Sequence, residues 1–243
     1  MIVDRTYKIS AFGDFSDIFP TADNMMFFLE TFKDEGLFPS VFQELKIENS
    51  NPQPTTLQRI ALVSNDGLES VPIASNRIDY EWKSTEDVKI SIERLNEIQG
   101  KASRVFGLIF NKFDKKASRL ALNTESLVVG LTDDELLGFL SKFSNPISIY
   151  NESGLKEWNT RLMTCKTGQI GNKEELFNVI TIISKAILHK NVDNQVVQSE
   201  GFSINADINT VAERSVQRFS SDDFSPFIDL TTKLWNSIIE ELG

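Results

Sequence analysis

The chain has 243 residues, of which 40% are hydrophobic and 25% are charged, and these fractions exclude a disordered, collagen-like or low-complexity protein. Asp and Glu number 35 against 25 Lys and Arg, so the net charge of −10 predicts repulsion of nucleic-acid phosphates. No apolar run approaches the roughly 18 residues of a membrane helix, the start lacks a signal-peptide pattern, and the single Cys165 fits a reducing compartment. We therefore expect a cytoplasmic protein that binds neither nucleic acid nor a membrane.

The first fifty residues predict two strands and a helix. Apolar and polar residues alternate over 2–12, which is typical of a half-buried strand. Thr21 is a favoured N-cap for the helix that follows, and Gly36 is a favoured residue at its end. Alternation returns over 41–48 and predicts a second strand, whereas the Pro and Asn residues of 49–54 predict a loop.

The clearest β pattern comes next. Three alternating runs are separated by the tight-turn sequence Asn65-Asp66-Gly67 and by Ser75-Asn76, whose residues favour turns. The runs are 57–64, 68–74 and 77–83. Ser84 then begins a predicted helix whose apolar residues recur every three or four positions, and we expect Gly100 to end it.

The remaining chain predicts the same kinds of element. Residues 104–113 are apolar on both faces, which favours a central strand, and 120–129 are expected to form a strand or an edge hairpin. Thr132 and Glu135 have the spacing of a capping box before a helix. Four further strands are predicted, the third because its β-branched residues outweigh a helical spacing: 146–150, 155–166, 176–188 and 201–209. A last helix begins near Ser225.

Several of these strands have one apolar and one polar face. In 77–83 and 201–209 every second residue is polar, which predicts a sheet with helices on one face and a free opposite face. An apolar centre contributed by 104–113 would be exposed on that free face, so we expect an interface there, most simply a homodimer. The expected core residues are Ile92, Leu95, Phe106, Leu108, Phe110, Leu140, Leu234 and Ile238.

Residues 1–103 and 104–243 each read as strand, helix, four strands, helix. This order predicts an α+β fold in which a curved antiparallel sheet packs on helices, built from two tandem β-α-β4-α halves that form one compact unit. It resembles the TATA-binding-protein-like and helix-grip group of folds. That scaffold hosts DNA binders, lipid carriers and chaperone partners, so the resemblance does not choose a function.

Two segments are also similar to a sporadically distributed family of uncharacterised bacterial proteins. That family has an Arg-rich central strand ending in Asn, which 104–111 match here, and a C-terminal Asp-x-Asp strand before a helix. This chain has Asn205-Ala206-Asp207 at the second place, so half of that motif is matched. The resemblance implies no particular activity.

The most enzyme-like pattern is Glu81-x-Lys83, which resembles the metal-binding end of restriction-endonuclease-like nucleases. Asp66 would supply the second carboxylate of a magnesium site. The same spacing occurs in Glu44-Leu45-Lys46 and a basic groove is missing, so the alternative is a solvent-exposed strand face. The single His189 and the scattered glycines predict no catalytic residue, no metal and no cofactor.

Two aromatic segments, 12–19 and 219–227, contain Asp and Ser between their rings. Aromatic side chains dominate interface hot spots, so these segments could dock a partner; the alternative is that they pack against the ends of the sheet. The candidate interface residues are Phe12, Phe15, Phe19, Phe219 and Phe224.

These observations favour a non-enzymatic interaction protein of a bacterial accessory or mobile-element system, which binds a protein partner or forms a homodimer. One alternative is a small-molecule or lipid carrier with a cavity under the C-terminal helix. The other is the magnesium-dependent nuclease at Asp66, Glu81 and Lys83. An acidic face would support the interaction protein, and an enclosed apolar pocket would support the carrier. Carboxylates clustered beside a basic groove would support the nuclease.

Overall fold

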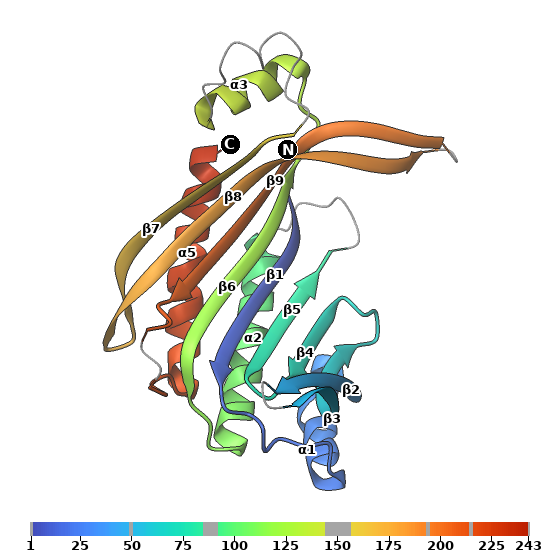
Figure 1. Ribbon diagram of the computed structural model, residues 1–243, viewed down its shortest axis with the longest axis vertical. Helices are drawn as coiled ribbons and strands as arrows, with labels where there is room; N and C mark the ends of the chain where they lie inside the picture. Colours follow the sequence, from blue (N-terminus) through green and yellow to red (C-terminus); the bar gives the residue numbers. More distant parts are fainter. Residues whose placement is uncertain are drawn as a thin grey trace.

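The computed structural model describes residues 2–48, 51–84, 92–143, 157–192, 195–213 and 216–242. One nine-stranded sheet in the order β2-β3-β4-β5-β1-β6-β9-β8-β7 runs through the molecule, and its neighbouring strands are antiparallel (Figure 1). The strands are β1 (Ile2–Gly13), β2 (Leu37–Glu48), β3 (Asn51–Ser64), β4 (Glu69–Ile73), β5 (Arg77–Lys83), β6 (Ala117–Val128), β7 (Asn159–Ile170), β8 (Lys173–Val192) and β9 (Gln195–Thr210). The helices are α1 (Ala22–Phe32), α2 (Ile92–Lys112), α3 (Asp133–Phe143) and α5 (Phe224–Leu242), with short 3-10 turns η1 (Lys33–Glu35) and η2 (Ser221–Asp223).

Helices α2 and α5 pack side by side on one face of the sheet, behind the strands in Figure 1. Tyr7 of β1 faces them, because its hydroxyl lies 3.3 Å from Oγ1 of Thr232 in α5. Tyr7, Ile9 and Ala11 are all buried on this side. The residues between them, such as Lys8 and Ser10, point to the opposite side, which none of the described helices covers. We call this side the free face.

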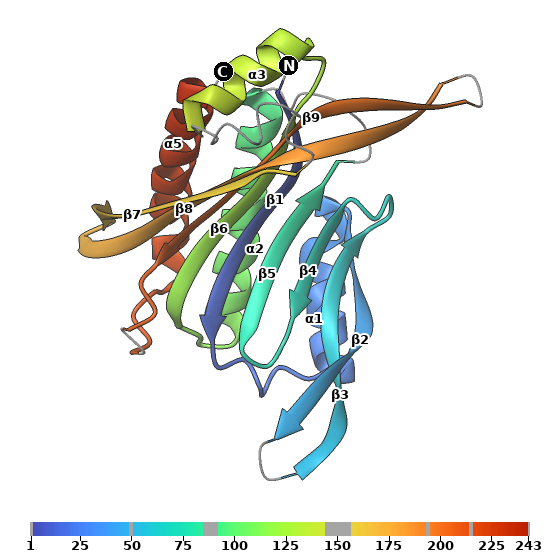
Figure 2. The same ribbon diagram turned by 45° about the horizontal axis from the view of Figure 1, so that its top comes forward.

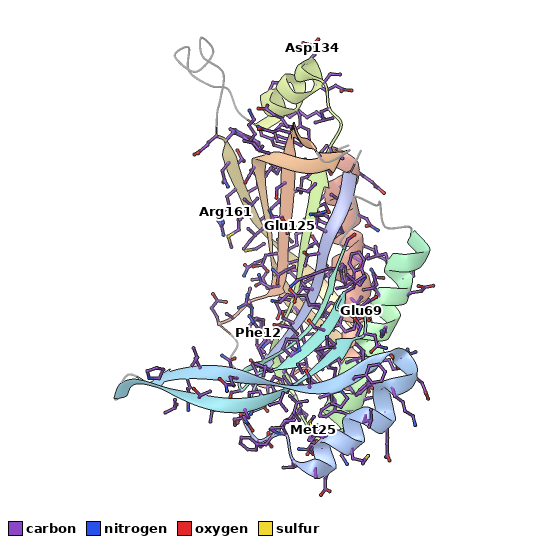
Figure 3. The ribbon with its side chains drawn as sticks, turned by 90° about the vertical axis from the view of Figure 1, so that its right-hand side faces the viewer. Phe12, Met25, Glu69, Glu125, Asp134 and Arg161 are labelled. Carbon is purple, nitrogen blue, oxygen red and sulfur yellow. The ribbon has the colours of Figure 1, made fainter. Side chains whose placement is uncertain are left out.

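Two hairpins extend beyond the body of the sheet. The β8–β9 hairpin reaches outward past the neighbouring strands (Figure 2). The β2–β3 hairpin projects toward the side of the free face, away from α1 and α2 (Figure 3). The free face is therefore bordered at one end by a projecting pair of strands.

The predicted α+β class with an antiparallel sheet is confirmed, and local signals account for most element ends. Oγ1 of Thr21 accepts a hydrogen bond from the Asn24 amide at 3.2 Å and so begins α1. Gly36 has a φ of 72°, a left-handed conformation that glycine adopts without strain. Thr132 and Glu135 form the reciprocal hydrogen bonds of a capping box before α3. The ambiguous segment 176–188 is a strand, inside β8.

The strand predicted for 104–113 is wrong, because α2 continues through Gly100 to Lys112. Buried residues recur every three or four positions along one side of α2: Ile98, Ala102, Val105, Phe106, Ile109 and Phe110. Leu108, predicted as core, lies outside this stripe and is 37% exposed. A short apolar segment fits both the strand and the helix period, and here the helical stripe meets the core. The argument for an apolar free face, and for a homodimer built on it, falls with this strand.

The loop predicted for 49–54 is also partly wrong, because β3 begins at Asn51 and pairs with Glu48 of β2. Strand β4 pairs only with residues 60–63 of β3, so within the described ranges the start of β3 has a neighbouring strand on one side. Proline is tolerated in a strand at such an edge position.

The structure places one predicted strand more exactly, and two predicted elements lie outside the residues that it describes. Residues 120–129 lie mostly in β6, which pairs with β1 and β9 in the middle of the sheet rather than at an edge. The first helical turn expected after Ser84 and the strand expected at 146–150 lie outside the described residues.

The order strand, helix, strands, helix occurs twice in the described chain, with different strand numbers. Four strands, β2 to β5, separate α1 from α2, and three described strands, β7 to β9, separate α3 from α5. The second β-α-β4-α unit is thus not reproduced in the described residues. The division into halves 1–103 and 104–243 stays a prediction, and α2 spans that position.

Phenylalanine rings fill the core between the sheet and its helices. Phe106 of α2 and Phe224 of α5 stack with centroids 4.5 Å apart, and Phe110 meets Phe224 edge to face at 4.8 Å. Phe15, from the segment after β1, contacts Phe110 in the same cluster. None of the helices that the structure describes has the length and apolarity needed to cross a membrane.

Candidate functional site

Strand β7 forms one edge of the sheet. Among the described residues it pairs with β8 alone, so the backbone groups on its outer side are available to another strand. Most of its side chains are exposed, and Leu162 and Met163 keep 50% and 51% of their surface accessible. An extended peptide can add to such an edge through main-chain hydrogen bonds. We take this edge as the candidate functional site.

A groove lies between β7, β8 and the end of α5, with a volume of about 280 Å³. Its walls include Leu162, Lys166, Val179, Leu234, Ile238 and Glu241. Gly168 of β7 permits the close approach of α5, because a Cβ at this position would lie 2.8 Å from Cδ2 of Leu230. The volume is slightly below the roughly 300 Å³ at which ligand pockets begin, and the half-exposed Leu162 opens the groove to solvent. A carrier function for the space under the C-terminal helix stays a prediction.

The charges of β7 have one sign. Arg161 and Lys166 are its charged residues, and it contains no Asp or Glu, although the whole chain has a net charge of −10. Cys165, between them, is exposed, with its Sγ 3.5 Å from Oδ1 of Asn178 in β8. The edge is thus a basic strand in an acidic protein. The periodicity of the sequence predicts most of this strand, but not its position at the edge.

The residues of the predicted nuclease site are only partly brought together. Glu81 and Lys83 lie on the same face of β5 and form an ion pair at 3.2 Å. The Asp66 carboxylate closes the β3–β4 turn, where Oδ1 accepts hydrogen bonds from Ser64 Oγ at 2.5 Å and the Leu68 amide at 3.0 Å. Within the described ranges, no three His, Cys, Asp or Glu side chains form a group suited to a metal ion. The nuclease stays a prediction.

The five candidate interface phenylalanines have different environments. Phe15, Phe219 and Phe224 have no exposed surface, so in this structure they pack in the core and offer nothing to a partner. Phe19 is 45% exposed, and the Arg59 guanidinium lies 5.6 Å from its ring centroid. Phe12 lies in β1 on the free face (Figure 3). Of the five candidates, Phe12 and Phe19 are therefore the ones whose rings a partner could contact.

Sequence reasoning misses a buried polar cluster between the sheet and α2. Glu69 of β4 is 8% exposed, accepts a hydrogen bond from the Tyr80 hydroxyl at 3.0 Å, and pairs with Lys101 of α2. Glu69 and Lys101 also line a cavity of about 400 Å³. Nearby, a hydrogen bond from Arg104 to Glu35 raises the pKa of the Arg104 guanidinium. These partners are far apart in sequence, and no local spacing links them. The buried pair joins α2 to the sheet.

Comparison of the chain with protein-family models, with curated proteins and with solved structures finds no match. The resemblances to the TATA-binding-protein-like group and to the sporadic bacterial family therefore stay predictions, and the function must be argued from the surface of this molecule.

Proposed function

We propose that this protein binds an extended segment of a partner protein along β7, so that the sheet gains a further strand. The observation that carries the proposal is the edge position of a twelve-residue strand with exposed side chains. Twelve residues span about 40 Å, which is ample for a peptide strand of six to eight residues. This proposal retains the leading hypothesis from the sequence, a protein whose task is to bind another protein.

The groove beside β7 supplies selectivity for side chains. A peptide paired with β7 presents every second side chain toward α5, where Leu234 and Ile238 form an apolar wall. The intervening side chains point to the free face, where Ile180 and Ile182 of β8 lie beside Met163 and Arg161. Both sides of an added strand would therefore meet apolar surface.

The charge of β7 indicates an acidic partner. Arg161 and Lys166 would attract Asp or Glu on an added strand, since opposite charges on adjacent strands are favourable. A second copy paired through β7 would place two purely basic strands against each other. The occupant that fits is thus an acidic, alternately apolar segment of a different protein.

The test is a titration of the full-length protein with synthetic peptides, followed by NMR of the backbone amides. The probes are an eight-residue peptide that alternates valine with glutamate, and the same peptide with lysine in place of glutamate. We expect the acidic peptide to shift the β7 amides with a dissociation constant below about 1 mM, and the basic peptide to bind at least about tenfold more weakly.

Matched charge reversals at the two edges of the sheet provide the control. Arg161→Glu in β7, on the face where the glutamates of the peptide would lie, should weaken binding of the acidic peptide at least about tenfold, whereas Lys46→Glu in β2 should leave it within about twofold. Equal binding of both peptides, or shifts confined to β2, would overturn the proposal. So would sedimentation of the 27.5 kDa chain as a dimer that the peptide dissociates, because β7 would then serve a second copy.

A further inference from the structure

Three residues form a row across the free face, on a site separate from β7. Phe12 of β1 pairs with Arg77 of β5 on one side and with Arg119 of β6 on the other. The guanidinium carbons of Arg77 and Arg119 lie 5.8 Å and 4.8 Å from the centroid of the Phe12 ring. Stacking on an aromatic ring orients a guanidinium while leaving its N–H edge available. The row therefore presents two oriented arginines beside one ring.

The two arginines differ in their partners. Nε of Arg77 forms an ion pair with Oδ2 of Asp79 at 2.9 Å, and Nζ of Lys8 lies 3.4 Å from the same oxygen. Arg119 has no carboxylate partner in the described part of the chain, and its Nε is buried without a hydrogen bond. Lys8 and Arg77 thus share Oδ2 of Asp79. Glu81, which lies opposite Lys8 on β5, is paired with Lys83. The next carboxylate on the neighbouring strand, Asp207, accepts a hydrogen bond from Asn209 Nδ2 at 2.9 Å.

The adjacent row on the free face is almost fully buried and, apart from Ala121 of β6, polar. Ser10, Asp79 and Asn209 are 1%, 5% and 2% exposed. Oδ1 of Asp79 is buried and accepts no hydrogen bond from any residue that the structure describes. A buried polar atom without a partner is unfavourable, so Oδ1 of Asp79 and Nε of Arg119 are an acceptor and a donor that a bound molecule could satisfy.

We propose that Arg119, Arg77 and Phe12 bind the oxyanion group, phosphate or carboxylate, of a small molecule on the free face. Arg119 supplies the planar fork that binds such a group through two parallel hydrogen bonds, and Arg77 adds a second positive charge. Oδ1 of Asp79 accepts a hydrogen bond from a hydroxyl or amine of the same molecule. The ring of Phe12 keeps both guanidinium groups in place.

Inorganic phosphate and acetate are the probes, titrated into the whole chain at constant ionic strength and followed by NMR of the backbone amides. We expect saturable shifts at residues 12, 77 and 119 with one of the two anions, and the stronger one identifies the class of ligand. Chloride at the same ionic strength should produce no saturable shift.

Two substitutions of Arg119 and one control substitution test whether this arginine binds the anion. Arg119→Gln should weaken the anion at least about tenfold, and Arg119→Lys, which keeps the charge but loses the fork, at least about threefold. Lys83→Gln removes the same charge from the free face, on β5 next to Glu81, and should leave the affinity within about twofold. The proposal is overturned by non-saturating shifts, by an equal response to chloride, or by an effect of Lys83→Gln as large as that of Arg119→Gln.

Discussion

The two edges of the sheet, β2 and β7, have the same length but different chemistry. Each is a twelve-residue strand with exposed aliphatic side chains, such as Val41 at 48% in β2 and Leu162 at 50% in β7. Strand β2 contains Pro39, which has no amide hydrogen to donate, and charges of both signs. Strand β7 contains neither proline nor acid. Exposed apolar surface alone does not distinguish the edges; proline and mixed charge do.

The edges also differ in how they are held. Glu44 of β2 accepts hydrogen bonds from the amide and hydroxyl of Ser75 and lies 3.5 Å from the buried Arg59. One side chain of β2 is therefore occupied in fixing the neighbouring turn, whereas β7 contacts α5 across an open groove. Native sheets protect the edges that must stay unpaired, so the unprotected edge is the one suited to accept a strand.

The largest expected effect is on the β2 side. Arg59 has no exposed surface and donates to the carbonyls of Phe15 at 2.5 Å, Ser16 at 3.0 Å and Ile73 at 3.2 Å. Arg59→Met would remove this buried donor from the three carbonyls and the positive charge beside Glu44, which would keep its hydrogen bonds from Ser75. We expect urea unfolding to show a loss of about 3–5 kcal/mol. Arg161→Met on β7 is the control, with a change within about 0.5 kcal/mol, and a loss below about 1 kcal/mol for Arg59→Met would contradict this account.

A pH experiment tests whether the two edges unfold together. Burial raises the pKa of Tyr7, in the central strand β1, from 10.0 to about 12. Between these values the unfolded chain loses the Tyr7 proton while the folded chain keeps it, so stability falls as pH rises, by roughly 3 kcal/mol in total. Tyr7→Phe should abolish this fall. Hydrogen exchange should report the fall at both β2 and β7; a response at one edge only would show that the sheet is not one cooperative unit.

Two glycines, one in the edge strand β7 and one in helix α2, allow a further comparison of close and open packing. Gly168→Ala in β7 places a Cβ 2.8 Å from Leu230, and we expect a loss of about 1–2 kcal/mol as α5 moves away from the strand. Gly100→Ala in α2 meets no described atom within 4 Å and should instead stabilise the protein by about 0.5–1 kcal/mol. Thermal unfolding of the two variants measures both. Changes of the same sign would show that helix propensity or packing has been misjudged at one site.

The smallest expected effect on stability comes from placing the same charge at both edges. Leu162→Glu and Val41→Glu add the same charge at equally exposed positions, and each should change the free energy of unfolding by no more than about 0.5 kcal/mol. Only Leu162→Glu should abolish binding of the acidic peptide, because it lies at the proposed site and adds a like charge. Calorimetry on both variants compares them, and equal loss of peptide binding would remove the distinction between the edges.

Part of the candidate site could be predicted from the sequence, and part could not. The alternation of 155–166 predicts most of β7, but the position of a strand in a sheet depends on which distant strands pair. Among the described strands, β7 pairs only with β8. The row of Phe12, Arg77 and Arg119 is likewise assembled from three strands. The alternation of 77–83 predicts the polar face of β5, but it does not predict which strands lie beside β5.

The sequence by itself determined the elements whose signals are local. Thr21 and Gly36 mark the ends of the first helix through capping and a positive φ, and the residues of β1 and β5 alternate because one face of each strand is buried. Tertiary structure decided the rest. Residues 104–112 became helix because the whole of α2 presents one buried stripe to the core, and Phe15, Phe219 and Phe224 became core because helices and strands close around them. Local periodicity cannot report such burial, since it depends on contacts between residues far apart in the chain.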